Sequence, residues 1–438
     1  MSDTNSPLSL NNLEMSDKAK PLLNAVIKHI RENVDPMSEE YYRLGEGREN
    51  RWSHTEGQMK LMNAAKQKAR DAGLWNFFLP NAETGEGLSN LDYAYIAAEL
   101  GKNPLASETL NCSAPDTGNM EVLERIGTPE QKEKWLKPLL AGEIRSAFAM
   151  TEPDRASSDA KNIGMTAVLE NGEWVMNGEK YYISGAGDPR CKIMIVMVKT
   201  SPDAEPFRQQ SQILVPMDTP GVEILGPMHV FGHDDAPHGH MHIKFTDVRV
   251  PETNMLWGEG KGFEISQVRL GPGRIHHCMR SIGQAEKALD LMIDRGLNRV
   301  AFGKKIVDLG KNMETISRAK IEIECMRLLV LKAAKAMDVL GNKEARIWVS
   351  MIKAKVPEQV CDIIDQAMQV HGATGISQWS PLSGMYAQQR TLRYADGPDE
   401  VHHHVIARHE VQTYKDSNSR QDAIKGDTQA RGSGGFMG

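Results

Sequence analysis

The stretch that decides the fold class is Trp174-Val175-Met176-Asn177-Gly178-Glu179-Lys180-Tyr181-Tyr182-Ile183-Ser184. The Asn-Gly pair inside it supplies the positive φ angles that a tight type I′ turn requires. We therefore predict a β-hairpin here, with a return strand over residues 180–184. A hairpin in the middle of this chain is informative because the patterns on both sides of it are helical.

The hairpin belongs to a predicted β region that begins near Ser146. Short apolar or alternating runs at residues 193–198, 213–217 and 241–250 are typical of strands, and the last run ends at Pro251. We predict a small antiparallel β domain made of these strands.

Helical patterns flank the β domain on both sides. Towards the N-terminus, apolar residues recur at mixed spacings of three and four in the runs 18–33, 56–72 and 91–100. Towards the C-terminus, apolar stripes cover residues 321–340 and 348–370. The order along the chain is therefore helices, a β domain and helices again.

The length of 438 residues favours about three domains at roughly 150 residues each. We predict an α+β fold with the following parts: an N-terminal helical domain (1–145), the β domain (146–258), a C-terminal helical bundle (259–414) and a polar mobile tail (415–438).

The composition is ordinary for a soluble globular protein, with 40% hydrophobic and 25% charged residues. No apolar run approaches the roughly 20 residues that span a bilayer, and the N-terminus lacks the features of a secretory signal. Five scattered cysteines indicate reduced thiols. We expect a cytoplasmic protein without membrane insertion, and the net charge of −6 argues against nucleic acid as its partner.

Two segments at the β domain have the chemistry to contact a flat cofactor. Residues 148–159, at the junction into the domain, are dense in small and hydroxylated side chains that suit a polar ring; a capped loop is the alternative. On the predicted return strand, Tyr182 and Ser184 share one face by the two-residue period. They either cover a cofactor face or form a half-exposed strand face.

Two further segments lie in the C-terminal helical region. Arg299 precedes a Phe302-Gly303 break, and its guanidinium suits phosphate, although a solvated basic loop fits the same residues. Gln369 and Gly372 belong to a glycine-rich run that either lets backbone approach a ligand or simply caps a helix.

Asp396 stands immediately before the helix breakers Gly397 and Pro398. A carboxylate at a chain bend late in a helical domain is a candidate base at the floor of a pocket, and a solvated acid at a helix end is the alternative.

Taken together, these segments resemble the acyl-CoA dehydrogenase flavoprotein family from about Met15 to Val411. The resemblance implies that FAD is the cofactor and that Asp396 is the catalytic base. The flavin contacts that it implies come from Phe148, Met150, Thr151, Ser157, Tyr182 and Ser184. The residues that it implies for a neighbouring subunit's FAD are Arg299, Phe302, Gln369 and Gly372.

Three departures from the family pattern limit this transfer. The loop after Thr-Glu-Pro is one residue longer, so either Ser157 or Ser158 contacts flavin or CoA. Gly273, before Arg274, occupies the position where some members carry their base. Asp396 replaces the usual Glu. Residues expected to contact substrate are Ser158, Arg274, Gly397 and His238.

The sequence around Asp396 resembles one branch of the family, which in animals is fused to aminoglycoside-phosphotransferase-like kinase domains. That resemblance implies α,β-dehydrogenation of acyl-CoA, as in β-oxidation, including chains with a 4-hydroxyl or 4-phosphate. It also implies an electron-transferring flavoprotein as acceptor and a homodimer or homotetramer. The alternatives are a flavin-dependent monooxygenase or oxidase, and a non-catalytic relative that binds acyl-CoA or nucleic acid.

Five histidines between residues 229 and 242 raise the question of a metal site. His238, His240 and His242 alternate, so they share a face if they lie on one strand. We expect no metal here; contact with an anionic group of the substrate is the preferred role for His238 or His240.

Overall fold

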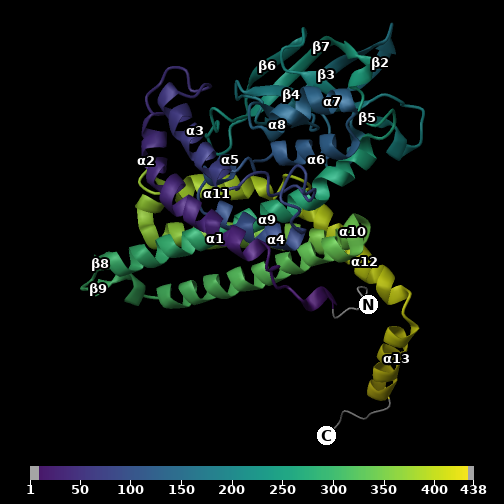
Figure 1. Ribbon diagram of the computed structural model, residues 1–438. Coiled ribbons are helices and arrows are strands. Elements are labelled where there is room, and N and C mark those ends of the chain that lie inside the picture. The colour runs from purple at the N-terminus through teal and green to yellow at the C-terminus, as the bar shows by residue number, and fades with distance from the viewer. Residues whose placement is uncertain (1–8, 433–438) are drawn as a thin grey trace.

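The computed structural model describes residues 9–432, and Figure 1 shows a β domain set against a layer of long helices. The N-terminal region is helical, as predicted. Its helices are α1 (Ala19–His29), α2 (Asp35–Arg43), α3 (Glu56–Asp71), α4 (Asn90–Leu100), α5 (Ala106–Thr109), α6 (Asp116–Ile126), α7 (Pro129–Gln131) and α8 (Lys137–Leu140).

The β domain follows as a seven-stranded sheet. Its strands are β1 (Arg145–Ala149), β2 (Thr166–Glu170), β3 (Glu173–Ser184), β4 (Cys191–Lys199), β5 (Gln210–Pro216), β6 (Val222–Pro227) and β7 (His240–Pro251). The spatial order is β1-β4-β2-β3-β7-β6, with β5 also paired to β4. Most pairs are antiparallel, as predicted, but β4 runs parallel to β1 and β2.

The predicted hairpin turn at Asn177-Gly178 is wrong. Strand β3 passes through both residues, and its pairing with β7 shifts register between Met176 and Gly178. The turn lies one strand earlier, where Asn171 (φ 51°) and Gly172 (φ 84°) connect β2 to β3. Both Asn-Gly pairs allow positive φ, but only this one separates two segments that pair with each other.

The C-terminal region begins with α9 (Gly262–Asn298) and a short ribbon of β8 (Val300–Ala301) and β9 (Lys304–Lys305). The remaining helices are α10 (Asn312–His371), α11 (Leu382–Leu392), α12 (Asp399–Lys415) and α13 (Asn418–Gly432). The segment predicted as a polar tail therefore contains a helix, and residues 433–438 lie outside the described part of the chain.

Helix α10 folds back on itself at Gly341, whose backbone is not helical (φ 76°, ψ 172°). The salt bridge from Lys355 Nζ to Glu322 Oε2, 3.0 Å long, joins the two halves side by side. The two predicted stripes at 321–340 and 348–370 are thus confirmed as two helical halves separated by a glycine.

The two helical regions share one hydrophobic core, whereas the β domain has a second core of its own. Helix α4 lies in the shared core and packs closely on α9. A Cβ added to Gly101 would stand 2.0 Å from the carbonyl oxygen of Arg280, and one added to Gly283 would stand 2.0 Å from that of Ala98. Glycine at both positions therefore sets the spacing of the two helices.

We expect Gly283→Ala to lower the stability of the protein by about 1–3 kcal/mol, because the added methyl group collides with backbone that cannot rotate away. The measurement is the midpoint of thermal unfolding. Gly273→Ala is the matched control on the same helix, since a Cβ there meets open space; it should be neutral or stabilising by up to about 1 kcal/mol. Equal midpoints for the two variants would contradict the prediction.

Candidate active site

Asp396 lies in a tight turn between α11 and α12. Both Asp396 (φ 58°) and Gly397 (φ 104°) have positive φ, a region that Asp tolerates better than most residues and that glycine adopts freely. Arg274 Nε of α9 donates a 2.9 Å hydrogen bond to the carbonyl oxygen of Asp396. The structure thus brings together three residues that the sequence analysis assigned to the site: Asp396, Gly397 and Arg274.

The Asp396 side chain faces a histidine of α9. Its Oδ2 atom lies 3.5 Å from His277 Nε2, and both side chains are about one quarter exposed or less. On the other side of the imidazole ring, Nδ1 of His277 lies 3.1 Å from Arg280 Nη2. A line of polar groups therefore runs from Asp396 along one face of α9.

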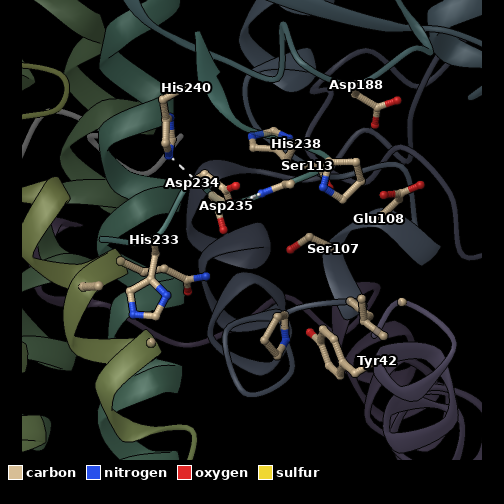
Figure 2. Close-up of a pocket in the computed structure, with 18 of the residues that line it drawn as sticks. Tyr42, Ser107, Glu108, Ser113, Asp188, His233, Asp234, Asp235, His238 and His240 are labelled. Carbon is tan, nitrogen blue, oxygen red and sulfur yellow. Dashed lines mark hydrogen bonds and ion pairs between the residues drawn. The ribbon is translucent and has the colours of Figure 1, made fainter. Parts of the chain in front are cut away.

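This line of groups opens into a cavity of about 990 Å³. His277 and Arg280 lie in its wall, together with Leu392 of α11. The opposite wall comes from α2, from the segment around α5 and from the loop before β7 (Figure 2). A cavity of this size between helices is suited to the elongated chain of a small-molecule ligand.

Buried and half-buried charges form one part of the cavity wall. The Glu108 carboxylate makes salt bridges to Lys66 (2.8 Å), Arg145 (3.0 Å) and Arg190 (2.6 Å). Burial opposes ionisation of Glu108, but the three cations outweigh it and hold the pKa of this carboxyl well below its usual value. Arg145 and Arg190 also pair with Asp116 and Asp188, respectively, so three cations face three carboxylates.

The loop before β7 brings two histidines to the cavity. His238 is half-buried in the wall, and burial lowers its pKa to about 4, so its imidazole is neutral near pH 7. His240 lies 2.8 Å from the hydroxyl of Ser184. It also lies 3.5 Å from Asp235 (Figure 2). A neutral His238 suits a hydroxyl group better than the anionic group expected from the sequence.

The histidines do not converge as a metal site would require. His242 contacts Glu179 at 2.8 Å, whereas His240 contacts Ser184 and Asp235. Strand β7 begins only at His240, so His238 lies outside it. Within residues 9–432, no three His, Cys, Asp or Glu side chains are placed to hold a metal ion.

The Thr-Glu-Pro segment is fastened to β3 by a buried ion pair. Lys180 Nζ lies 2.8 Å from Glu152 Oε1, and both side chains are almost fully buried. The same lysine donates to the carbonyl oxygen of Met150 at 2.9 Å, and the hydroxyl of Thr151 donates to that of Tyr181 at 2.5 Å. Met150 and Thr151 are therefore held beside the strand that carries Tyr182.

The side chains beside this junction differ in how much of their surface is exposed for contact with a ligand. Tyr182 is 45% exposed with φ 55° and stacks edge-on against Tyr181. The Ser157 hydroxyl is buried and accepts a hydrogen bond from the backbone N–H of Glu152, so it supports the loop. Ser158 is exposed, and Phe148 is half-buried in β1. Of the two serines, Ser158 therefore has the hydroxyl open to a ligand.

The Arg299 and Gln369 segments meet at one end of the C-terminal helices. Phe302 (φ 51°) and Gly303 (φ 73°) form the tip of the β8–β9 ribbon, and the Phe302 ring is 96% exposed. Gly372 (φ 65°) caps α10 just after Gln369, and Arg295 Nη2 donates to the carbonyl oxygen of His371 at 3.4 Å. Arg299 follows the end of α9, about 33 Å along the helix axis from His277. These residues therefore lie apart from the cavity of their own chain.

The residues that surround Asp396, and those of the far cavity wall, were not predicted from the sequence. His277 stands three residues after Arg274, a spacing that places both on one face of α9. That spacing was the available signal. Glu108 and His402 have no comparable local signal, since their partners lie in other elements.

Three family models match the chain in order. They are the acyl-CoA dehydrogenase N-terminal domain (residues 17–143), middle domain (147–248) and C-terminal domain (260–411). No helix among the described residues is long and apolar enough to cross a membrane.

Individual relatives agree with these matches. The chain is 54% identical over 356 residues to the Mycobacterium tuberculosis protein called "Probable acyl-CoA dehydrogenase FadE2", a match covering 81% of this chain and 86% of that one. It is 50% identical over 402 residues to mouse acyl-CoA dehydrogenase family member 11, a match covering 91% of this chain but only 51% of the mouse protein. The chain thus spans about half the length of that relative.

A solved structure of a Mycobacterium abscessus protein assigned to the acyl-CoA dehydrogenases is similar throughout. Its TM-score is 0.87 and its sequence identity is 47%, with 92% of this chain and 100% of that chain covered. The helix–sheet–helix architecture predicted from the sequence is therefore confirmed by a solved fold.

Proposed function

Because the chain belongs to the acyl-CoA dehydrogenase family, we propose that it is an FAD-dependent enzyme that converts an acyl-CoA to its 2-enoyl-CoA. The observation that carries this proposal is the placement of Asp396 beside His277, which lies in the wall of a large cavity. In the proposed reaction, the Asp396 carboxylate takes the α-proton of the thioester. Bound FAD would supply the acceptor for the hydride of the β-carbon.

The chain's own residues supply the positions that this reaction needs. Removing an α-proton requires a base held within hydrogen-bonding reach of the carbon. Arg274 fixes the main chain of Asp396, while His277 stands against its carboxylate. An aspartate is shorter than a glutamate by one methylene, roughly 1.5 Å, so the position of this turn determines whether the carboxylate reaches the substrate.

The residues at the β1–β3 junction fit a flavin ring. Tyr182 presents an exposed aromatic ring, and the hydroxyl groups of Thr151 and Ser184 lie on the same junction. An aromatic face beside hydroxyl groups suits a flat ring system with polar edges. We propose that Phe148, Met150 and Ser158 complete this binding site.

The exposed residues at the far end of the bundle fit a role in a second copy of the chain. Phe302 and Gln369 are exposed and lie far from the cavity of their own chain. With Arg299 and Gly372, we propose that they bind the FAD of a neighbouring subunit in a homodimer or homotetramer. We further propose an electron-transferring flavoprotein as acceptor, and the cytoplasm as the compartment.

The polar wall of the cavity supports an acyl chain that carries a hydrogen-bonding group. Ser107, Ser113 and the neutral His238 line the wall next to the Glu108 cluster. A plain hydrocarbon chain would satisfy none of these groups, whereas a hydroxyl both donates and accepts. The balanced charges around Glu108 leave less excess positive charge for a phosphate. We therefore propose 4-hydroxyacyl-CoA as the preferred substrate, ahead of 4-phosphoacyl-CoA.

A panel of acyl-CoAs of one chain length tests this proposal. Under anaerobic conditions, the unsubstituted and 4-hydroxy compounds should bleach the flavin, and the 4-hydroxy compound should half-saturate at the lower concentration. The 4-phospho compound tests the effect of negative charge at carbon 4, and a 3-methyl compound tests the effect of added bulk on the acyl chain. If no acyl-CoA bleaches the flavin while the reduced protein consumes oxygen rapidly, the enzyme is a monooxygenase or oxidase instead.

A further inference from the structure

The turn that carries Asp396 has a left-handed backbone conformation, with φ 58° at Asp396. A non-glycine residue with φ near 58° has a backbone energy above that of the ordinary regions. Such a conformation persists only where the surrounding structure imposes it. The contacts that impose it here come from three different helices.

Main-chain carbonyl groups of the turn accept hydrogen bonds from each of these helices. Arg274 of α9 donates to the carbonyl oxygen of Asp396, and Nε2 of His402, on α12, lies 3.3 Å from the same oxygen. Lys353 of α10, 1% exposed, donates to the carbonyl oxygens of Ala395 (2.9 Å) and Leu392 (2.5 Å). The backbone on which the carboxylate stands is therefore clamped from three sides.

His402 is the member of this clamp with a fixed tautomer. Because its Nε2 faces a carbonyl oxygen, that nitrogen carries the hydrogen, and its Nδ1 is left to accept from the Ser350 hydroxyl 3.4 Å away. The ring is only 4% exposed, and burial lowers its pKa to about 4, which keeps it neutral near pH 7.

The glycine after Asp396 makes room for this imidazole ring. A Cβ on Gly397 would stand 2.9 Å from His402 Nε2, which is closer than a Cβ atom normally comes to another heavy atom in proteins. Gly397 thus serves two purposes: it adopts φ 104°, and it lets His402 reach the turn.

We propose that His402 is a positioning residue that fixes the left-handed Asp396 turn and so delivers the short carboxylate to the substrate. This proposal rests on the proposed function, in which Asp396 is the base. Without His402, one of the two hydrogen bonds on the Asp396 carbonyl is lost and the turn relaxes. A displacement of about 1 Å costs roughly 100-fold in rate, but Arg274 and Lys353 remain, so a loss of about 10- to 100-fold is expected.

The test compares His402→Leu with His402→Gln in the FAD-loaded enzyme. The leucine variant should reduce its flavin about 10- to 100-fold more slowly with saturating acyl-CoA, with KM changed by less than about threefold. The glutamine variant, whose amide can still donate to the Asp396 carbonyl oxygen, should recover most of the rate. His403→Leu, at the exposed neighbouring position, is the matched control and should react like the wild type.

A double-mutant cycle separates positioning from a general structural role. Asp396→Glu and His402→Leu should be non-additive in the rate of flavin reduction by at least about tenfold, since both change the reach of the same carboxylate. Gly397→Ala is an independent variant, because its methyl group displaces the imidazole ring; it should slow flavin reduction even if His402→Leu loses FAD.

The outcomes distinguish this inference from the function on which it rests. Wild-type rates in both His402→Leu and Gly397→Ala, alongside an inactive Asp396→Asn, would overturn the positioning role and leave the base in place. Undiminished flavin reduction in Asp396→Asn would instead remove Asp396 as the base. Additive effects in the cycle would assign His402 to stability alone.

Discussion

Asp396→Asn should slow flavin reduction by acyl-CoA about 10²- to 10⁴-fold, the usual contribution of a general base. The substitution keeps the hydrogen bonds that hold the turn, because Arg274 and His402 bind the main-chain carbonyl oxygen of Asp396. Asparagine also tolerates positive φ. The variant should therefore keep its yellow FAD and its thermal stability, and lose only the chemical step.

The measurement is stopped-flow flavin bleaching under anaerobic conditions with saturating substrate. Glu400→Gln is the control, because Glu400 is an exposed acid four residues further on. Asp399 is a weaker candidate for the base, since its carboxylate is buried against Arg393 Nε at 2.6 Å. Bleaching at the wild-type rate in Asp396→Asn would show that another group removes the proton.

Glu108→Gln should destabilise the protein by about 3–5 kcal/mol, the largest effect on stability that we expect from a single substitution. The glutamine leaves Lys66, Arg145 and Arg190 without the carboxylate that all three share. Removing one partner from a group of buried charges typically lowers the stability of a protein by about 3–5 kcal/mol. The measurement is the thermal unfolding midpoint. Glu133→Gln removes a solvent-exposed pair with Lys137 and should leave the unfolding midpoint nearly unchanged.

The same carboxylate makes stability depend on pH in a definite direction. The pKa of Glu108 is held well below its unfolded value of about 4.3, so its contribution is fully present above that value. As the pH falls through the lower, folded pKa, the carboxylate is protonated and the contribution disappears. The wild type should therefore lose more stability than Glu108→Gln as pH falls below about 4. Parallel pH profiles for the two proteins would contradict this account.

Local patterns in the sequence predicted the elements that local forces determine. The amphipathic runs at 56–72 and 91–100 became α3 and α4, and the runs at 193–198 and 241–250 became parts of β4 and β7. The hairpin was placed wrongly because two Asn-Gly pairs stand six residues apart, and turn chemistry alone does not say which pair lies between strands that bond to each other. Strand pairing is a long-range property.

The residues of the candidate site also divide into those with a local sequence motif and those identified only by contacts in the folded chain. Recognisable local motifs include Asp396, Arg274 and Tyr182. The roles of these three residues come from the resemblance of the motifs to a family, and they remain predictions. His277 gains its importance only from contact with Asp396, which lies on a distant segment. His402 stands only six residues after Asp396, but its contact with the carbonyl oxygen of Asp396 depends on the shape of the intervening turn. The polar character of the cavity was also invisible, because Lys66, Glu108 and Arg190 meet only in the folded chain.

The hydrophobic core that joins the two helical regions also constrains how the chain is made. Helix α4 ends at Leu100, and α9, which covers it, begins at Gly262. At a synthesis rate of about 5–20 residues per second, the apolar surface of α4 waits roughly 8–30 seconds for its partner. By the end of that interval all strands of the β domain, which has a separate core, have been synthesised. The N-terminal helices are thus the part of the nascent chain that most needs protection from aggregation.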